Sequence, residues 1–220
     1  MNKPNTYETV RVSPPSPTTA PLRSARGAGL LCATSAVLLV IGCAVTQWQF
    51  AVTTVPDDTW RFPWSPTAFI VTTLIWATTQ AAVVPALLVW QRSGSAGSGF
   101  AARWGLRLLV VGSVIGVVAH LASLPFVDAK FEDIAALGAV FGIGALLATV
   151  GFLMAGVGTV RTHRWTGVFR WTPLGIGIVG VALMFLQFTP LLPTGVGLYY
   201  LGFVPLGLAV AGYARTETRA

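Results

Sequence analysis

The stretch that decides the fold is residues 67–90, TAFIVTTLIWATTQAAVVPALLVW, which contains no charged side chain. A helix rises about 1.5 Å per residue, so a helix of this length crosses the hydrocarbon core of a bilayer, which is about 30 Å thick. The stretch follows Trp64-Ser65-Pro66, where tryptophan suits the membrane interface, serine a helix N-cap and proline the first helical turn. We therefore predict a transmembrane helix over residues 66–90.

The composition of the whole chain extends this interpretation. The protein has 220 residues, of which 54% are hydrophobic and 10% charged, whereas soluble domains carry about 25% charged residues. The apolar residues come in long runs, and they predict an all-α polytopic membrane protein, a single domain built as a bundle of six transmembrane helices. The predicted spans are about 27–47, 66–90, 106–127, 134–160, 173–189 and 196–214. The last two are near the lower length limit, and a re-entrant pair is the alternative for them.

The two ends of the chain are polar. Residues 1–26 are rich in Pro, Ser and Thr, and such a segment buries too little apolar surface to offset the entropy of ordering it. We predict a disordered cytoplasmic tail there and a second, short cytoplasmic tail at residues 215–220.

The basic residues predict the orientation. Under the six-span topology, twelve of the 14 Lys and Arg residues fall on one side, and the other side holds only Arg61 and Lys130 together with five of the seven acids. By the positive-inside rule, both termini are predicted to be cytoplasmic. The basic residues therefore indicate topology rather than nucleic-acid binding, although the net charge is +7. The usage of Ala, Gly and Arg, with little Lys, is typical of GC-rich bacteria, which indicates a multi-pass protein of a bacterial cell membrane.

No Asp, Glu, Lys or Arg lies deep in any predicted span, which leaves His120 as the ionisable candidate at depth. His120 follows Gly112 and Gly116 at four-residue intervals, so the three share one helix face, and the glycines are predicted to let another helix approach. One hypothesis makes His120 a proton or ligand group near the outer end, with Asp58 and Glu132 as further weak catalytic candidates. The simpler interpretation is an imidazole hydrogen-bonded to a neighbouring helix.

Two amides also lie at depth. Gln80 and Gln187 each stand sixteen residues after the tryptophan of a Trp-Ser/Thr-Pro motif, at Trp64 and Trp171. The shared spacing suggests that spans 1–3 and 4–6 are inverted repeats, as in many transporters; two helices that start alike by chance are the alternative. The amides are predicted either to join helices by hydrogen bonds or to line a substrate cavity.

The fourth predicted span is rich in glycine. Gly138 and Gly142 form a small-residue face at four-residue spacing, which predicts close packing against another helix in the bundle. A homodimer interface is the alternative.

Motifs for soluble catalysis and for metals are absent from the sequence. It has no HExxH, P-loop or GxSxG motif and no Cys/His pair. Cys32 and Cys43 are eleven residues apart on one predicted helix, about 16 Å, which is too far for a disulfide. We therefore predict no metal site and no cofactor.

Three functions remain open. The first is a non-enzymatic membrane component that packs with itself, as a homo-oligomer, or with a membrane protein partner. The second is a small carrier or channel for a neutral or hydrophobic substrate. The third is an intramembrane enzyme acting on a lipid or isoprenoid, such as a cyclase with aromatic walls at Trp60, Trp64 and Trp76. A cavity lined by Gln80 and Gln187 would favour the carrier, and one reached by Asp58, Glu132 and His120 would favour the enzyme.

Overall fold

A computed structural model describes residues 20–187 and 189–213 of the chain. In this part of the protein the regular structure is entirely helical, and six helical segments are long and apolar enough to cross a membrane. The predicted all-α, six-span fold is therefore confirmed. The helices are α1 (Ala20–Val52), α2 (Pro66–Ser93), α3 (Phe100–Ala122), α4 (Ala135–Thr162), α5 (Val168–Leu186), α6 (Leu192–Leu201) and α7 (Phe203–Leu208), with the short turns η1 (Leu124–Phe126), η2 (Glu132–Ile134) and η3 (Ala209–Tyr213).

Several helix ends differ from the predicted spans. Helix α1 begins at Ala20, inside the predicted tail at residues 1–26; the rest of that tail and the tail at residues 215–220 lie outside the described residues. Helix α3 runs from Phe100 to Ala122 rather than over residues 106–127. It ends earlier because Pro125 disfavours helical backbone at the residue before it, and the Ser123 hydroxyl donates to the His120 carbonyl, 2.7 Å away.

The last two spans are the segments Val168–Leu186 and Leu192–Gly212, and both reach a length that can cross a bilayer. Helix α5 starts at Val168, so Pro173 lies inside the helix instead of at the predicted start. The Thr172 hydroxyl donates to the Val168 carbonyl one turn earlier, at 3.0 Å. The sixth span is interrupted at Gly202, between α6 and α7, three residues before Pro205.

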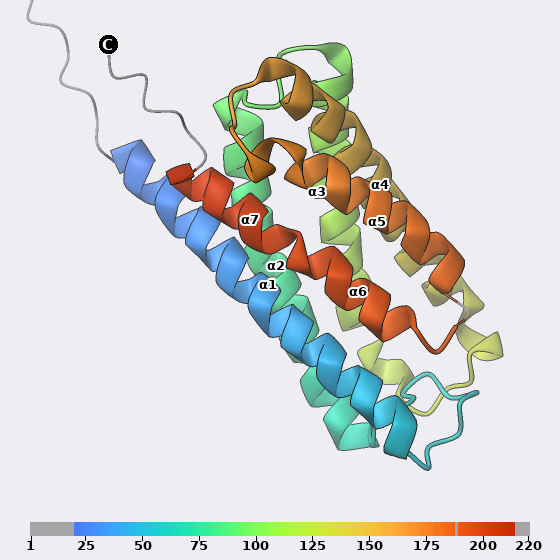
Figure 1. The fold of residues 1–220 in the computed structure, drawn as a ribbon. Coiled ribbons are helices and arrows are strands. Elements are labelled where there is room, and N and C mark those ends of the chain that lie inside the picture. Colours follow the sequence, from blue (N-terminus) through green and yellow to red (C-terminus); the bar gives the residue numbers. More distant parts are fainter. Residues whose placement is uncertain (1–19, 188, 214–220) are drawn as a thin grey trace, which may run out of the picture.

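The helices form a ring. Each span packs most extensively against the spans before and after it in the sequence, and α1 closes the ring by packing against α6, α7 and η3 (Figure 1). Residues 20 and 213 therefore lie at the same end of the bundle.

The two ends of the bundle differ in charge. The basic end carries both described chain ends and the loops 94–99 and 163–167, with Arg26, Arg92, Arg103, Arg107, Arg161, Arg164 and Arg170 on or near them. The acidic end carries the loops 53–65 and 123–134, with Asp57, Asp58, Asp128, Glu132 and Asp133.

Glycines allow the tightest helix contacts. A Cβ on Gly112 of α3 would lie 2.6 Å from the backbone nitrogen of Ala148 and from the carbonyl oxygen of Gly144, both on α4. A Cβ on Gly207 of α7 would lie 2.5 Å from the carbonyl oxygen of Gly29 on α1. Side chains would separate the helices at both places, so these glycines set the diameter of the ring.

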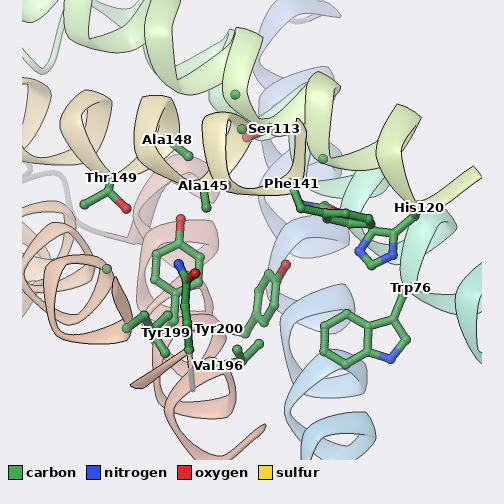
Figure 2. Close-up of a pocket in the computed structure, with 18 of the residues that line it drawn as sticks. Trp76, Ser113, His120, Phe141, Ala145, Ala148, Thr149, Val196, Tyr199 and Tyr200 are labelled. Atoms are coloured by element: carbon green, nitrogen blue, oxygen red, sulfur yellow. The ribbon is translucent and has the colours of Figure 1, made fainter. Parts of the chain in front are cut away.

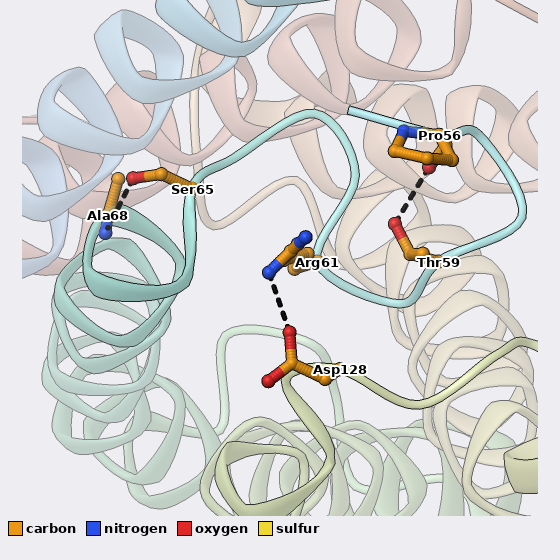
Figure 3. Close-up of polar contacts among 6 residues, drawn as sticks. All are labelled: Pro56, Thr59, Arg61, Ser65, Ala68 and Asp128. Atoms are coloured by element: carbon orange, nitrogen blue, oxygen red, sulfur yellow. Dashed lines mark hydrogen bonds and ion pairs between the residues drawn. The ribbon is translucent and has the colours of Figure 1, made fainter. Parts of the chain in front are cut away.

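The loops at the acidic end are joined to each other. The backbone nitrogen of Trp60 donates to the Ala129 carbonyl at 2.9 Å, and Arg61 forms an ion pair with Asp128 at 2.6 Å (Figure 3). Lys130 forms a second ion pair with Asp58 at 3.3 Å. These contacts hold loops 53–65 and 123–134 together as a cap over one end of the ring, which we call the acidic cap.

Candidate functional site: a cavity inside the helix ring

The ring contains a partly open cavity of about 680 Å³ in the half of the bundle nearer the acidic end. This volume falls within the range of small-molecule sites, about 300–1,000 Å³. Side chains from α2, α3, α4, α5 and α6 line it, together with Trp60 and Phe131 of the acidic cap and Phe203 of α7. The lining residues are Trp60, Trp76, Gln80, Val83, Gly112, Ser113, Gly116, His120, Phe131, Gly138, Phe141, Gly142, Gly144, Ala145, Ala148, Thr149, Gly180, Leu183, Met184, Gln187, Leu192, Val196, Tyr199, Tyr200 and Phe203.

Toward the basic end, the cavity stops at a layer of buried aromatic rings. Phe152 and Trp90 are fully buried and stack with centroids 6.3 Å apart, and Trp90 also stacks on Trp165 at 5.7 Å. Phe203, which lines the cavity, contacts Phe152 edge to face at 5.2 Å. This aromatic layer separates the cavity from the basic end of the bundle.

Toward the acidic end, two aromatic side chains lie over the cavity. The ring of Trp60 contacts the rings of Phe131, at 5.3 Å, and of Phe141, at 5.9 Å. Trp60 and Phe131 come from the two loops of the acidic cap, so the ion pairs that join those loops also position this cover.

The middle of the cavity has an aromatic wall (Figure 2). His120 meets Phe141 edge to face, with centroids 4.9 Å apart, and lies 6.0 Å from Trp76. Trp76 in turn contacts Tyr200 at 5.9 Å, and Tyr200 contacts Tyr199 at 5.5 Å. Aromatic faces at these separations favour a planar apolar or aromatic guest.

Several polar groups in the wall have no hydrogen-bond partner within the described part of the chain. The amide oxygen of Gln80 is buried without a donor. No hydrogen bond is present to the side chains of His120, Thr149, Tyr199 or Tyr200 within residues 20–187 and 189–213, and Figure 2 shows both tyrosine hydroxyls directed into the cavity. These groups are therefore available for hydrogen bonds to a molecule inside the cavity.

The described lining carries no formal charge, because Asp, Glu, Lys and Arg are absent from it. Among the described residues, no group of three or more His, Cys, Asp or Glu side chains could hold a metal ion. The chemistry available is therefore hydrogen bonding by neutral groups and contact with apolar and aromatic surfaces.

The structure brings most of the residues selected from the sequence to this cavity. His120, Gln80, Gln187, Gly112, Gly116, Gly138 and Gly142 all line it. Gln80 and Gln187 are not hydrogen-bonded to each other; the Gln187 amide contacts the Met184 sulfur at 3.6 Å.

The carboxylates lie elsewhere. Asp58 and Glu132 do not line the cavity: Asp58 pairs with Lys130 at the surface, and Glu132 is exposed. The convergence of Asp58, Glu132 and His120 that would favour an enzyme is therefore not present in this arrangement. Trp60 and Trp76 line the cavity, whereas Trp64 does not.

The glycines of α4 need a correction. Gly138 and Gly142 were expected to pack against another helix of the bundle, but a Cβ on either would have no heavy atom within 4 Å. Within one copy of the chain they border open space beside the cavity. Small residues can serve either purpose, because four-residue spacing places them on one face without saying what that face meets.

The sequence reasoning missed Tyr199, Tyr200, Phe141 and Thr149. A signal existed for the tyrosines: two adjacent phenols near the middle of a span are unusual, because tyrosine in membrane helices favours the interface. Comparison with known proteins adds no assignment, since the chain matches no family model, no curated protein and no solved structure.

Proposed function

We propose that this protein binds a neutral, largely apolar small molecule in the cavity of its helix ring and serves as a membrane carrier for it. The observation that carries the proposal is the buried, unpartnered amide oxygen of Gln80 in the wall of a cavity of about 680 Å³. A buried polar group without a partner costs about 1–3 kcal/mol, and a ligand that supplies the missing bond recovers it.

The uncharged lining supports a neutral ligand. A charged molecule would lose its hydration on entering and would meet no opposite charge among the described lining residues. The aromatic wall around Trp76 and Phe141 supports a mostly apolar molecule.

The geometry favours this function over the two alternatives. A component that acts only through helix packing gains nothing from a cavity with several unpartnered polar groups, because filling it with apolar side chains would be more stable. An enzyme of the type considered above would need its carboxylates at the cavity, and Asp58 and Glu132 lie outside it.

The membrane environment supports the proposal as well. The six apolar spans suggest a multi-pass membrane protein. We infer from the charge difference between the ends that the basic end faces the cytoplasm of a cell membrane. The cavity then lies in the half of the membrane that faces away from the cytoplasm.

The test is to purify the protein in lipid nanodiscs, extract it with organic solvent and analyse the extract by mass spectrometry. Gly142→Leu is designed to occupy cavity space: Gly142 lines the cavity, and a Cβ there meets no heavy atom within 4 Å. Gly175→Leu is the matched control: its Cβ also meets nothing, but Gly175 is exposed on α5 and does not line the cavity.

We expect a neutral molecule in extracts of the wild-type protein and of the Gly175→Leu variant, reduced at least fivefold with Gly142→Leu. Carrier function requires in addition that vesicles with the wild-type protein exchange the identified molecule between leaflets faster than vesicles with the Gly142→Leu variant. Equal amounts of every extracted species in all three proteins would overturn the proposal.

A further inference from the structure

The cavity is only partly enclosed, and we place its side opening between α4 and α5. In the basic half of the bundle these helices touch: a Cβ on Gly156 would lie 2.6 Å from the Leu174 backbone nitrogen, and one on Gly180 would lie 2.6 Å from the Thr149 hydroxyl oxygen. Further toward the acidic end α5 also packs on α6, where Leu183 lies 2.7 Å from a Cβ built on Gly195.

Residues on the rim of this opening are small or exposed. Gly138, Gly142 and Ala145 follow one another on one face of α4, and a Cβ on either glycine meets no heavy atom within 4 Å. Ala145 and Gln187 line the cavity and are nevertheless exposed. Both flanking helices belong to apolar spans, so an opening here would face lipid.

The polar contacts lie on the opposite wall. Gln80 of α2 lines the cavity, and its amide oxygen has no donor in the described chain. The oxygen is turned away from the open space in this conformation, so a ligand reaches it when the amide rotates toward the cavity. His120 and Tyr200 have no hydrogen-bond partner in the described chain either, and their rings flank Trp76 at centroid distances of 6.0 and 5.9 Å. A ligand headgroup held here needs a hydroxyl that donates to Gln80, and a planar ring suits the surrounding aromatic faces.

We propose that the ligand is a single-tailed neutral lipid with a hydroxyl-bearing aromatic headgroup, which enters sideways from the bilayer. This inference rests on the function proposed above. The phenolic hydroxyl donates to the Gln80 amide oxygen and accepts from His120 or Tyr200. The hydrocarbon tail leaves through the opening between α4 and α5, beside Gly142 and Ala145.

The probe is radiolabelled 4-dodecylphenol, bound at equilibrium to the protein in nanodiscs, with empty nanodiscs subtracted for partitioning into lipid. Its methyl ether, 4-dodecylanisole, has the same ring and tail but no donor. A third probe, 4-ethylphenol, keeps the headgroup and lacks the tail. We expect the phenol to bind at least tenfold more tightly than either of the other two.

Variants assign the contacts. With Gln80→Leu the long phenol and its ether should bind equally, whereas Gln47→Leu, which removes an amide that accepts from Thr194 outside the cavity lining, should preserve the tenfold preference. Gly142→Leu should weaken both long probes at least fivefold, and Gly175→Leu should change neither.

The failures of the two proposals can be told apart. Equal binding of phenol and ether to the wild-type protein would overturn the headgroup assignment, and equal binding of 4-ethylphenol would overturn the side opening for a tail. In both cases, the carrier proposal would still be supported if a molecule extracted from the wild-type protein were missing from extracts of the Gly142→Leu variant. Absence of saturable binding by every probe, with identical extracts from all variants, would overturn both.

Discussion

The amide of Gln80 lies directly against Gly116: a Cβ on this glycine would be 2.7 Å from the Gln80 side-chain nitrogen. Four residues earlier on the same face of α3, a Cβ on Gly112 would meet backbone atoms of α4 at 2.6 Å. The two glycines thus face different neighbours, a movable side chain and a fixed helix.

Alanine at these two glycines should separate folding from binding. Gly116→Ala displaces only the end of the Gln80 side chain, so we expect a nearly normal free energy of unfolding and a several-fold weaker binding of 4-dodecylphenol. Gly112→Ala forces α3 and α4 apart, so we expect the free energy of unfolding to fall by about 1–3 kcal/mol. SDS titration in mixed micelles measures the free energy of unfolding, and binding to the protein in nanodiscs measures the affinity for 4-dodecylphenol. Equal destabilisation by both variants would contradict the view that Gly116 faces a movable side chain and Gly112 a fixed helix.

Gln80→Leu should stabilise the protein while it removes the headgroup contact. The buried amide oxygen has no donor in the described chain, so its removal is expected to raise the free energy of unfolding by about 1 kcal/mol. Gln47→Leu is the matched control, since Gln47 accepts from the Thr194 hydroxyl at 2.9 Å and its loss should not stabilise. SDS titration of the ligand-free proteins measures the free energy of unfolding of each variant. A Gln80→Leu variant less stable than the wild-type protein would show that the amide has a structural partner.

The acidic cap should respond to salt. The Asp128 side chain of the Arg61–Asp128 ion pair is 70% exposed. Asp128→Asn should therefore lower the free energy of unfolding by less than about 1 kcal/mol. This difference from the wild-type protein should shrink as the salt concentration rises. Asp133→Asn, at a carboxylate without an ion-pair partner in the described chain, is the control and should have no such salt-dependent effect. If Asp128→Asn still lowered the free energy of unfolding in 1 M salt, Asp128 would contribute more than its charge.

The contact between the first and last spans depends on Gly29. A side chain there would collide with the Ala211 nitrogen and the Gly207 carbonyl oxygen, whereas a Cβ on Gly27, two residues away, meets nothing within 4 Å. Gly29→Leu should therefore lower the thermal midpoint and expose α7 to proteolysis, and Gly27→Leu should do neither. Similar melting curves for the two variants would argue against tight packing at this contact.

Cysteine labelling tests the predicted orientation. Cys32 and Cys43 are 0% and 2% exposed, so the background should be low. Asp57→Cys, in the acidic cap, should react with a membrane-impermeant maleimide in intact cells. Ser98→Cys, in the exposed loop at the basic end, should react only after permeabilisation. The reverse pattern would place the basic end outside.

The sequence predicted the membrane fold because apolar length is a direct physical requirement of a bilayer. It also predicted Gln80 and His120 as residues of interest, because a polar group in an apolar span is expensive unless it has a purpose. Both line the cavity.

Other features depend on tertiary geometry that no local pattern contains. Gly112 and Gly138 have the same four-residue spacing to a second glycine, yet a Cβ on Gly112 would meet α4 at 2.6 Å and one on Gly138 meets nothing within 4 Å. Asp58 was a catalytic candidate because it lies at the outer end of a span, but its carboxylate pairs with Lys130 at the surface and does not line the cavity. Which neighbour a side chain meets depends on how the helices tilt and where the ring closes.

The closed ring also has a consequence for biosynthesis. The cavity wall includes Val196, Tyr199 and Tyr200 of α6, and α6 and α7 join the ring by packing against α1, the first helix made. A chain that emerges from the ribosome N-terminus first therefore holds an open five-helix arc until its last span is inserted. The cavity is completed by the final helix, so a truncated or stalled product lacks a finished cavity even when its earlier spans are in place.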